Sequence, residues 1–349
     1  MSTPKLRPVH VKKNKATRRD MADPSAMLMG KLRLICKVLE EVDGIPNFLH
    51  IGSGEYKLSY DEKALKALET KVTDLKGLIE HLQGQPEILR AEYMDIVRYA
   101  NKPCIPGSSI KGTVRARLEL SFTAEKGVVY SCFHSADRLS YKNQPGWFHF
   151  KLWMPATQEQ RNNNKVCNAT APYNKVKVCA TCNLLGAPGL ASRIFFGNLE
   201  HVKGHLVRLE LDRGEKIIAF APGSVFQGDI TFLGLRDEEL GLLLVGLGAN
   251  ENGIFVPILM GKSKYRCRKV IKSEPPDWTG KTVRFGVLKI EVQELNIIDF
   301  GFSTKLIREE LRQHIADYVI KAKEKFPGLK IGISEAEKAT VLLNKEVDI

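Results

Sequence analysis

The residue types and spacing best suited to chemistry lie in IPGSSIKGTVRAR, residues 105–117. Pro106 and Gly107 interrupt the preceding segment, and the two serines can cap a helix that we expect to begin near Ser109. The N–H groups and positive dipole end of such a helix suit a phosphate, and nearby basic side chains add charge. An ordinary helix cap is the alternative. The candidate anion-binding residues are Gly107, Ser108, Ser109, Lys111, Gly112, Arg115 and Arg117.

Two further segments combine glycine, serine and basic residues. In FLHIGSGE, residues 48–55, two glycines around a serine predict a tight backbone loop. In MGKSKYRCRKV, residues 260–270, basic residues alternate with Tyr265, which suits a single-stranded nucleic acid with a stacked base. Position 256 is Val256, where a Walker motif needs glycine, so ATP hydrolysis is disfavoured. These segments add the candidates Gly52, Ser53, Gly54, Lys262, Ser263, Lys264 and Arg266.

The cysteine spacing indicates a metal site. The chain has seven cysteines, and an odd count in a reducing compartment argues against a disulfide framework. Cys179 and Cys182 form a CxxC pair with Cys167 upstream, which predicts a closed structural zinc site with either His134 or Cys132 as the fourth ligand. A pair of small buried residues is the ordinary alternative, and a redox pair is less favoured because the thioredoxin context is missing.

The overall charge favours a polyanionic partner. Lys and Arg number 53 against 40 Asp and Glu, and the resulting charge of +13 attracts nucleic acid, although many soluble proteins are basic for other reasons. No apolar run approaches a membrane span and the N-terminus is polar and basic, so we expect a cytoplasmic protein without membrane contact. No nucleophile–base pair emerges. His50 and His149 could serve acid–base chemistry, but packing roles are more common for such residues.

Apolar periodicity predicts an α+β domain that positions these residues. Alternating strands are expected in KLRLICKVLEEV, SRIFFGNLEHV, SVFQGDITFLGL and RFGVLKIEVQEL, and helices after Ser109 and in DEELGLLLVGLG. Their order, β-α-β-β-α-β, is the ferredoxin-like pattern. We expect a flexible basic arm at 1–29, a domain at 30–299 and a C-terminal helical segment at 300–349. The domain carries a helical insertion at about 56–92 and a cysteine-rich insertion at 130–182.

Several of these segments occur together and in order in a known family. LHIGSGE, KPCIPGSSIKGTVRARLE, CNLLGAPGLASRIFFGNLE and PGSVFQGDI, followed by EELGLLLVGLG and a GKS-containing loop, resemble the RAMP superfamily subunits of type III (Csm/Cmr type) CRISPR effector complexes. The resemblance covers most of residues 31–295 and implies an RRM-like, ferredoxin-like fold. It also implies a guide-RNA-binding structural subunit in antiviral defence, with guide RNA, paired target RNA and other effector subunits as partners. Zinc in some family members at the matching insertion agrees with the cysteine pattern.

The resemblance also keeps an enzymatic alternative open. The subunit of this family that cleaves target RNA carries an aspartate in the loop that corresponds to the insertion at 56–92, and Tyr93 falls near that place here. The neighbouring carboxylates Glu92 and Asp95 are therefore candidate catalytic residues of an endoribonuclease. MDIVRYANKPCIPGSS is closer to the subunit at the 3′ side of the guide, which does not cut. A guide-processing nuclease that uses His50 and a basic RNA-binding protein outside CRISPR defence are further alternatives.

Overall fold

The computed structural model describes residues 10–17, 27–69, 72, 74–84, 89–132, 166–170, 175–299 and 302–346. His134, His149 and much of the insertion at 130–182 lie outside these described residues. The side chain of Glu92 also lies outside what is described.

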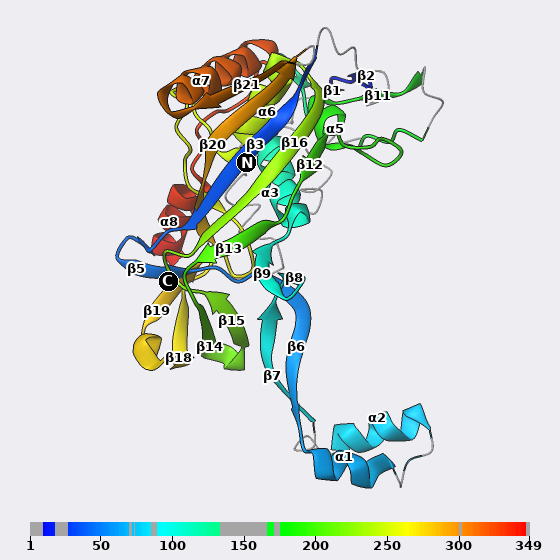
Figure 1. Cartoon of the computed structure of the whole chain (residues 1–349), viewed down its shortest axis with the longest axis vertical. Helices are drawn as coiled ribbons and strands as arrows, with labels where there is room; N and C mark the ends of the chain where they lie inside the picture. The colour runs from blue at the N-terminus through cyan, green and yellow to red at the C-terminus, as the bar shows by residue number, and fades with distance from the viewer. Residues whose placement is uncertain are drawn as a thin grey trace, which may run out of the picture.

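A nine-stranded sheet forms the larger part of the fold, with β3 near its centre (Figure 1). β3 alternates because one of its faces packs against helices, so Leu32 and Leu34 are fully buried while Lys37 is exposed. Both neighbours run antiparallel to β3 and place Ile230 and Leu295 opposite Leu32. The strands in spatial order are β17 (Ile258–Leu259), β20 (Val287–Asp299), β3 (Leu28–Val38), β16 (Val225–Leu235), β13 (Leu199–Lys203), β9 (Lys102–Ile105) and β8 (Arg98–Tyr99), with β12 (Ile194–Phe196) on β16 and β21 (Phe302–Ile307) on β20.

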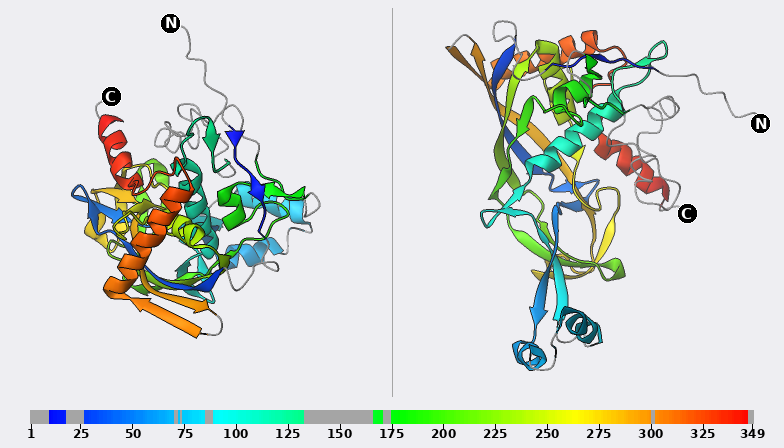
Figure 2. Two further views of the ribbon diagram at one scale, coloured as in Figure 1. Left: turned by 90° about the horizontal axis from the view of Figure 1, so that it is seen from above. Right: turned by 90° about the vertical axis from the view of Figure 1, so that its right-hand side faces the viewer.

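Helices α3 (Gly107–Ser121), α6 (Asp237–Leu247) and α7 (Arg308–Lys325) lie on one side of this sheet and share a core with it (Figure 2). α6 is apolar nearly all round because it lies between other elements. It packs closely on α7, where the carbonyl of Tyr318 leaves no room for a side chain at Gly241. The predicted strands and both predicted helices of this layer are present, with α3 beginning at Gly107.

A second sheet of eight strands packs below the first and was not predicted from the sequence (Figure 1). Phe48, Val207, Leu209 and Phe285 belong to its separate small core and are fully buried. Its strands in spatial order are β4 (Glu41–Val42), β5 (Ile45–Phe48), β19 (Thr282–Phe285), β18 (Arg268–Glu274), β14 (Leu206–Leu211), β15 (Lys216–Phe220), β7 (Leu89–Ile96) and β6 (Gly52–Tyr60).

β6 and β7 extend beyond both sheets as a two-stranded ribbon that leads to helices α1 (Glu62–Glu69) and α2 (Leu75–Gly84) (Figure 1). These helices lie within the segment predicted as a helical insertion. The predicted tight loop at Gly52–Gly54 is wrong, because Gly52 pairs with Ile96 and the segment opens strand β6. The glycine-rich segment is irregular only in that the pairing of β6 with β7 shifts register between Gly52 and Tyr56.

Part of the arm predicted to be flexible is built into the fold. Ala16 donates its backbone N–H to the carbonyl of Val176 at 3.1 Å, and Thr17 donates to Oδ1 of Asn183 at 2.8 Å. Residues 10–17 therefore lie against the cysteine-rich insertion, because their backbone groups find partners there. The elements involved are β1 (His10–Val11) paired with β10 (Val128–Val129), β2 (Asn14–Lys15) paired with β11 (Lys177–Val178), and α5 (Ala180–Leu185).

The C-terminal segment contains a strand as well as helices. β21 precedes α7, and α8 (Glu335–Glu346) follows it. Arg284 of β19 holds α8 through the carbonyl of Ala336 at 3.0 Å and the hydroxyl of Thr340 at 2.5 Å. Within the residues that the structure describes, no helix combines the length and apolarity needed to cross a membrane. Two short 3₁₀ helices, η3 (Asp212–Gly214) and η4 (Pro276–Trp278), complete the described elements.

A fully buried arginine joins the cysteine-rich insertion to the main helical layer. Arg193 donates to the carbonyls of Asn183 at 3.1 Å and Gly234 at 2.6 Å, and Nη1 donates to Oε2 of Glu239 at 2.9 Å. Glu239 is the nearby carboxylate that offsets this buried charge. A buried cation without its partner is costly, whereas an exposed pair contributes little.

Glu239→Gln is therefore expected to lower the free energy of unfolding by about 3 kcal/mol, because the amide keeps the shape but leaves the Arg193 charge uncompensated. The matched control is Asp237→Asn in the same turn, where the ion pair with Lys321 is partly exposed. We expect that variant to be destabilised by less than about 1 kcal/mol. Denaturant unfolding of both variants measures the difference, and equal destabilisation would contradict the role given to Arg193.

Candidate nucleic-acid interface

Three segments predicted separately from the sequence meet around one pocket of about 440 Å³. The start of β6, the first turns of α3 and the loop after β17 each contribute to it. These segments are distant in the chain, and pairing of β6 with β7 together with the position of α3 under the sheet brings them together. The pocket is lined by Ile51, Gly52, Met94, Ser109, Gly112, Thr113, Ala116, Met260, Gly261, Lys262 and Lys264.

The charged residues that line the pocket are both lysines. Nζ of Lys262 lies 2.6 Å from Oε1 of Glu215, so its charge is held at the rim by an ion pair. Nζ of Lys264 lies 5.1 Å from the centre of the Tyr265 ring, and burial lowers the pKa of Lys264 below that of an ordinary lysine. A cation with few water molecules around it gains more from a phosphate than a fully solvated one. The pocket therefore suits an anion.

Most N–H groups at the start of α3 have acceptors within the protein. Pro106 supplies no side-chain cap, but Oδ1 of Asn198 accepts the N–H of Gly107 at 3.0 Å, and the carbonyl of Pro106 accepts that of Ser109 at 2.9 Å. Gly112 faces open space, so a ligand can approach the backbone of α3 closely there. The first turn carries no acidic residue that would oppose an anion at the positive end of the helix dipole.

His50 lies beneath the pocket and fixes its parts relative to one another. Nδ1 of His50 lies 2.7 Å from the carbonyl of Ile218, and Nε2 lies 3.3 Å from the sulfur of Met94. Its own carbonyl accepts the N–H of Lys262 at 3.0 Å. Burial lowers the pKa of His50, so the neutral ring is favoured. The side chain is 1% exposed, which favours a positioning role over acid–base chemistry.

Four cysteines converge in the cysteine-rich insertion. The sulfurs of Cys132, Cys167, Cys179 and Cys182 all lie within 4.8 Å of one another, and the residues are buried. Sγ of Cys132 is 3.6 Å from Sγ of Cys182 and 3.7 Å from Sγ of Cys179. The structure thus unites the three predicted cysteines, with Cys132 as the fourth member. The other predicted fourth ligand, His134, lies outside the described residues.

The geometry and chemistry of this cluster fit a tetrahedral metal ion. Zinc–sulfur bonds of about 2.3 Å place sulfurs about 3.8 Å apart, close to the separations observed. Backbone N–H groups of Cys179 and Cys182 donate to the sulfurs of Cys167 and Cys179 at 3.2 and 3.4 Å. Hydrogen bonding to Cys132 is the largest cause of a lowered pKa at both Cys167 and Cys182, which favours thiolate at two positions.

Comparison with protein families gives a match over most of the chain, since the model of the RAMP superfamily matches residues 47–335. The chain belongs to the RAMP superfamily. No curated protein matches it. Among solved structures, it is similar to Csc2 of Thermofilum pendens, with 11% identity, TM-score 0.31, and coverage of 96% of this chain and 81% of that one. It is also similar to the Csm3–Csm4 subcomplex of a type III-A CRISPR–Cas interference complex, with 13% identity, TM-score 0.33, and coverage of 84% and 97%.

Two arginines of α3 that were predicted to bind phosphate are used within the fold of this RAMP protein. Arg115 is 9% exposed and Arg117 is 3% exposed. Arg117 donates to the carbonyl of Gly246 at 3.0 Å and pairs with Glu335 at 3.4 Å. Their guanidinium groups donate to acceptors within the protein, so neither arginine belongs to the proposed interface. Helical periodicity did not reveal this, because the later turns of α3 are buried on most sides.

The remaining candidates lie near the pocket without lining it. Ser108 and Arg266 are exposed, Lys111 and Ser263 are half-buried, and Gly54 follows Ser53 along β6. Sequence reasoning missed Met94, Met260, Thr113 and Ala116, whose apolar or small side chains carry no motif.

The two candidate catalytic residues belong to the strand that also carries the pocket residue Met94. Glu92 and Asp95 both lie in β7, where Met94 lines the pocket and Asp95 does not. Oδ1 of Asp95 lies 3.6 Å from Nη2 of Arg98, and it accepts the N–H of Ile96 at 2.8 Å. The Asp95 carboxylate thus has its partners among the residues that directly follow it in the chain.

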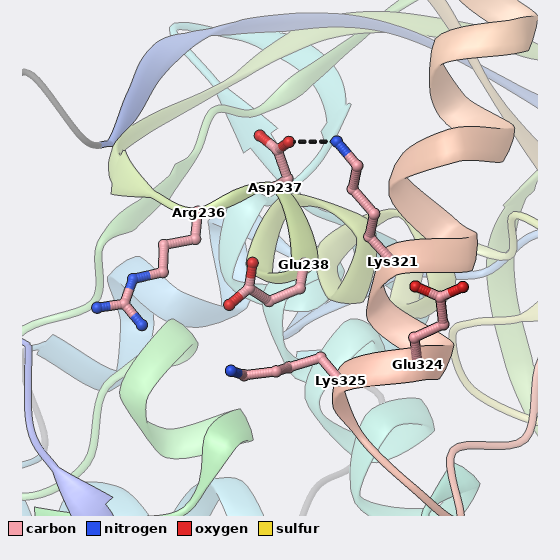
Figure 3. Close-up of a pocket in the computed structure, with 6 residues that line it drawn as sticks. All are labelled: Arg236, Asp237, Glu238, Lys321, Glu324 and Lys325. Carbon is pink, nitrogen blue, oxygen red and sulfur yellow. Dashed lines mark hydrogen bonds and ion pairs between the residues drawn. The ribbon is translucent and has the colours of Figure 1, made fainter.

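A second pocket, of about 600 Å³, lies between the start of α6 and the end of α7 (Figure 3). Asp237 and Lys321 pair across it at 2.5 Å. Its acidic and basic residues are equal in number, so a polyanion gains little net attraction there. The residues that line it are Arg236, Asp237, Glu238, Lys321, Glu324 and Lys325.

Proposed function

We propose that this RAMP protein is a guide-RNA-binding structural subunit of a type III CRISPR interference complex in antiviral defence. The observation that carries the proposal is the pocket in which Lys262, Lys264 and the small or polar side of α3 at Ser109, Gly112 and Thr113 face one volume. Phosphate contacts of this kind position an RNA without reading its sequence. Specificity then resides in base pairing between guide and target RNA.

The topology supports a ferredoxin-like, RRM-like domain as the scaffold. Strands β20, β3, β16 and β13 are adjacent in that order, with α3 following β3 and α6 following β16 along the chain. We propose that these elements form the β-α-β-β-α-β arrangement expected from the sequence. We propose other effector subunits, guide RNA and target RNA as partners, and the cytoplasm as the location.

Purification of the chain with its native partners, followed by sequencing of the RNA that accompanies it, tests the proposal directly. Short RNAs of uniform length that share a repeat-derived tag are expected. Random RNA, or none, would contradict membership of a guide-loaded complex and leave a basic RNA-binding protein of another kind.

Replacement of both pocket lysines tests the interface itself. Lys262→Ala with Lys264→Ala is expected to weaken RNA binding by the complex about 10-fold or more, because charge-assisted hydrogen bonds to phosphate can no longer form. The slope of log K against log salt should become shallower by about 0.7 for each phosphate that is no longer neutralised. Filter binding at several salt concentrations measures both quantities. The control removes the same charge from exposed strand positions outside the three candidate segments, as Lys203→Ala with Lys272→Ala, and should leave the affinity nearly unchanged.

The alternative is a target-RNA endoribonuclease that uses Glu92 or Asp95. The nuclease alternative is favoured by the position of Asp95 next to Met94, which lines the pocket. The ion pair of Asp95 with Arg98 favours a structural role instead. Asp95→Ala with Glu92→Ala should leave target-RNA cleavage by the assembled complex unchanged if the chain is structural. Cleavage reduced about 100-fold or more, with the complex still assembled, would support the nuclease instead.

We also propose that zinc is the metal held by Cys132, Cys167, Cys179 and Cys182. Four thiolates leave no open coordination position, which supports a structural role. The metal would fix the insertion and the N-terminal segment beside it, since Ala16 belongs to the same small core as the cysteines.

The purified protein, unfolded only to release its metal for analysis, is expected to yield about one zinc ion per chain. Cys182→Ser should lower that content strongly, because it removes one of four ligands. Cys104→Ser, an equally buried cysteine outside the cluster, should retain the metal. Equal zinc content in both variants would contradict the assignment.

A further inference from the structure

Helix α3 lies between the RNA pocket and the cysteine cluster. Ser109, Gly112, Thr113 and Ala116 line the pocket along one side of the helix. Arg115 points roughly a third of a turn away from that side, given 3.6 residues per turn. A displacement of α3 would therefore alter both features together.

Arg115 holds the segment that carries the CxxC pair at two places. Nη1 lies 3.7 Å from Sγ of Cys182, and Nη2 donates to the carbonyl of Gly186 at 2.5 Å. Gly186 ends α5, and its N–H donates to the carbonyl of Cys182 at 2.9 Å. One guanidinium thus contacts a metal-ligand sulfur and the end of the short helix that bears it.

The charge of this contact is suited to metal thiolates. Arg115 is 9% exposed, and its partner Glu119 lies 3.6 Å away with a fully buried side chain. Four thiolates around a divalent ion carry a net negative charge, which a buried guanidinium offsets. Hydrogen bonds to ligand atoms from outside the coordination sphere are a common means of orienting and strengthening metal sites.

We propose that Arg115 is the outer hydrogen-bond donor to the metal-bound sulfur of Cys182, and that it couples metal occupancy to the position of the RNA-facing turns of α3. The inference rests on the proposed function, because it assumes both the zinc site and the RNA pocket. It assigns to Arg115 a positioning role in place of the phosphate contact predicted from the sequence.

Transfer of zinc from the purified complex to a chelating dye tests the first half. Arg115→Met keeps the length of the side chain and removes the donors. We expect zinc affinity to fall, and release to accelerate, about 10-fold or more. The control is Arg117→Met, two residues along the same helix, which is equally buried and contacts Gly246, Ile333 and Glu335 instead. Arg117→Met should be less stable but release zinc at the wild-type rate.

RNA binding with and without added Zn²⁺ tests the coupling. The affinity of Arg115→Met for guide RNA should be reduced at limiting zinc and restored by excess zinc. The defect of Lys262→Ala with Lys264→Ala should persist in excess zinc, because those residues bind the RNA themselves. A purely structural role for Arg115 would give a defect that zinc does not repair.

Zinc release from Arg115→Met at the wild-type rate would overturn the inference, as would an RNA defect that is independent of zinc. If Arg115→Met does not fold, Arg115→Lys serves the same measurements, since it keeps the charge but cannot reach both Cys182 and Gly186. Faster release by that variant supports the proposal and unchanged release overturns it. The wild-type complex tests the proposed function separately. If that function is wrong, the wild-type complex itself will lack short tagged RNA or zinc.

Discussion

The fold depends on guanidinium groups that are withdrawn from water and satisfied by oxygens of segments far apart in the sequence. Arg193 joins the cysteine-rich insertion to α6, and Arg117 joins α3 to α6 and to the segment before α8. Arg284 fastens α8 to β19, and Arg268 joins β18 to Asp212 and Glu215. Because a buried cation is costly without such partners, each arginine fixes the relative position of the elements it contacts. These arginines are paired with carboxylates, so their withdrawal from water does not lower the net charge of +13.

The main sheet could be predicted because its strands carry a clear alternation. β3 has one face in the core, so Leu32 and Leu34 alternate with Arg33 and Ile35 as the pleat requires. The second sheet could not be predicted in the same way. Its strands are mostly short, and β15 is buried at nearly every position, so no alternation marks it. Strands such as β5 and β19 pair in parallel although about two thirds of the chain separates them, and local patterns do not reveal such pairing.

The pocket was partly predictable, since each of its three basic or glycine-rich segments carries its own local signal. The convergence of the three segments on one pocket could not be predicted, because it depends on the contacts of His50 and on the pairing of β6 with β7. Lys262 and Lys264 line the pocket, whereas Arg115 and Arg117 do not, and all four look alike in the sequence. The two arginines differ from the lysines because tertiary packing buries the sides of α3 from which they project. The cysteine cluster was predicted more completely because the CxxC spacing alone brings two of its cysteines together.

The open face of the main sheet offers a second surface for RNA, and its chemistry argues against it. In RRM domains, bases stack on aromatic side chains of the central strands. Here the central strands present Lys31, Arg33, Ile35 and Lys37 from β3, and Gln227, Asp229 and Thr231 from β16, none of which is aromatic. The flanking strand β12 adds one exposed aromatic side chain, Phe195, opposite Thr231.

The cations on that face are also already paired. Lys31 and Arg33 both contact Asp229, at 3.3 and 3.2 Å, so an incoming phosphate would have to displace a carboxylate. Of the two lysines of the pocket beside α3, Lys262 is likewise paired with a carboxylate, that of Glu215 at 2.6 Å, whereas Lys264 is a partly buried cation that lies over an aromatic ring. The proposed RNA interface therefore lies on the helical side of the sheet, where Arg115 of α3 also contacts Cys182 of the cysteine cluster.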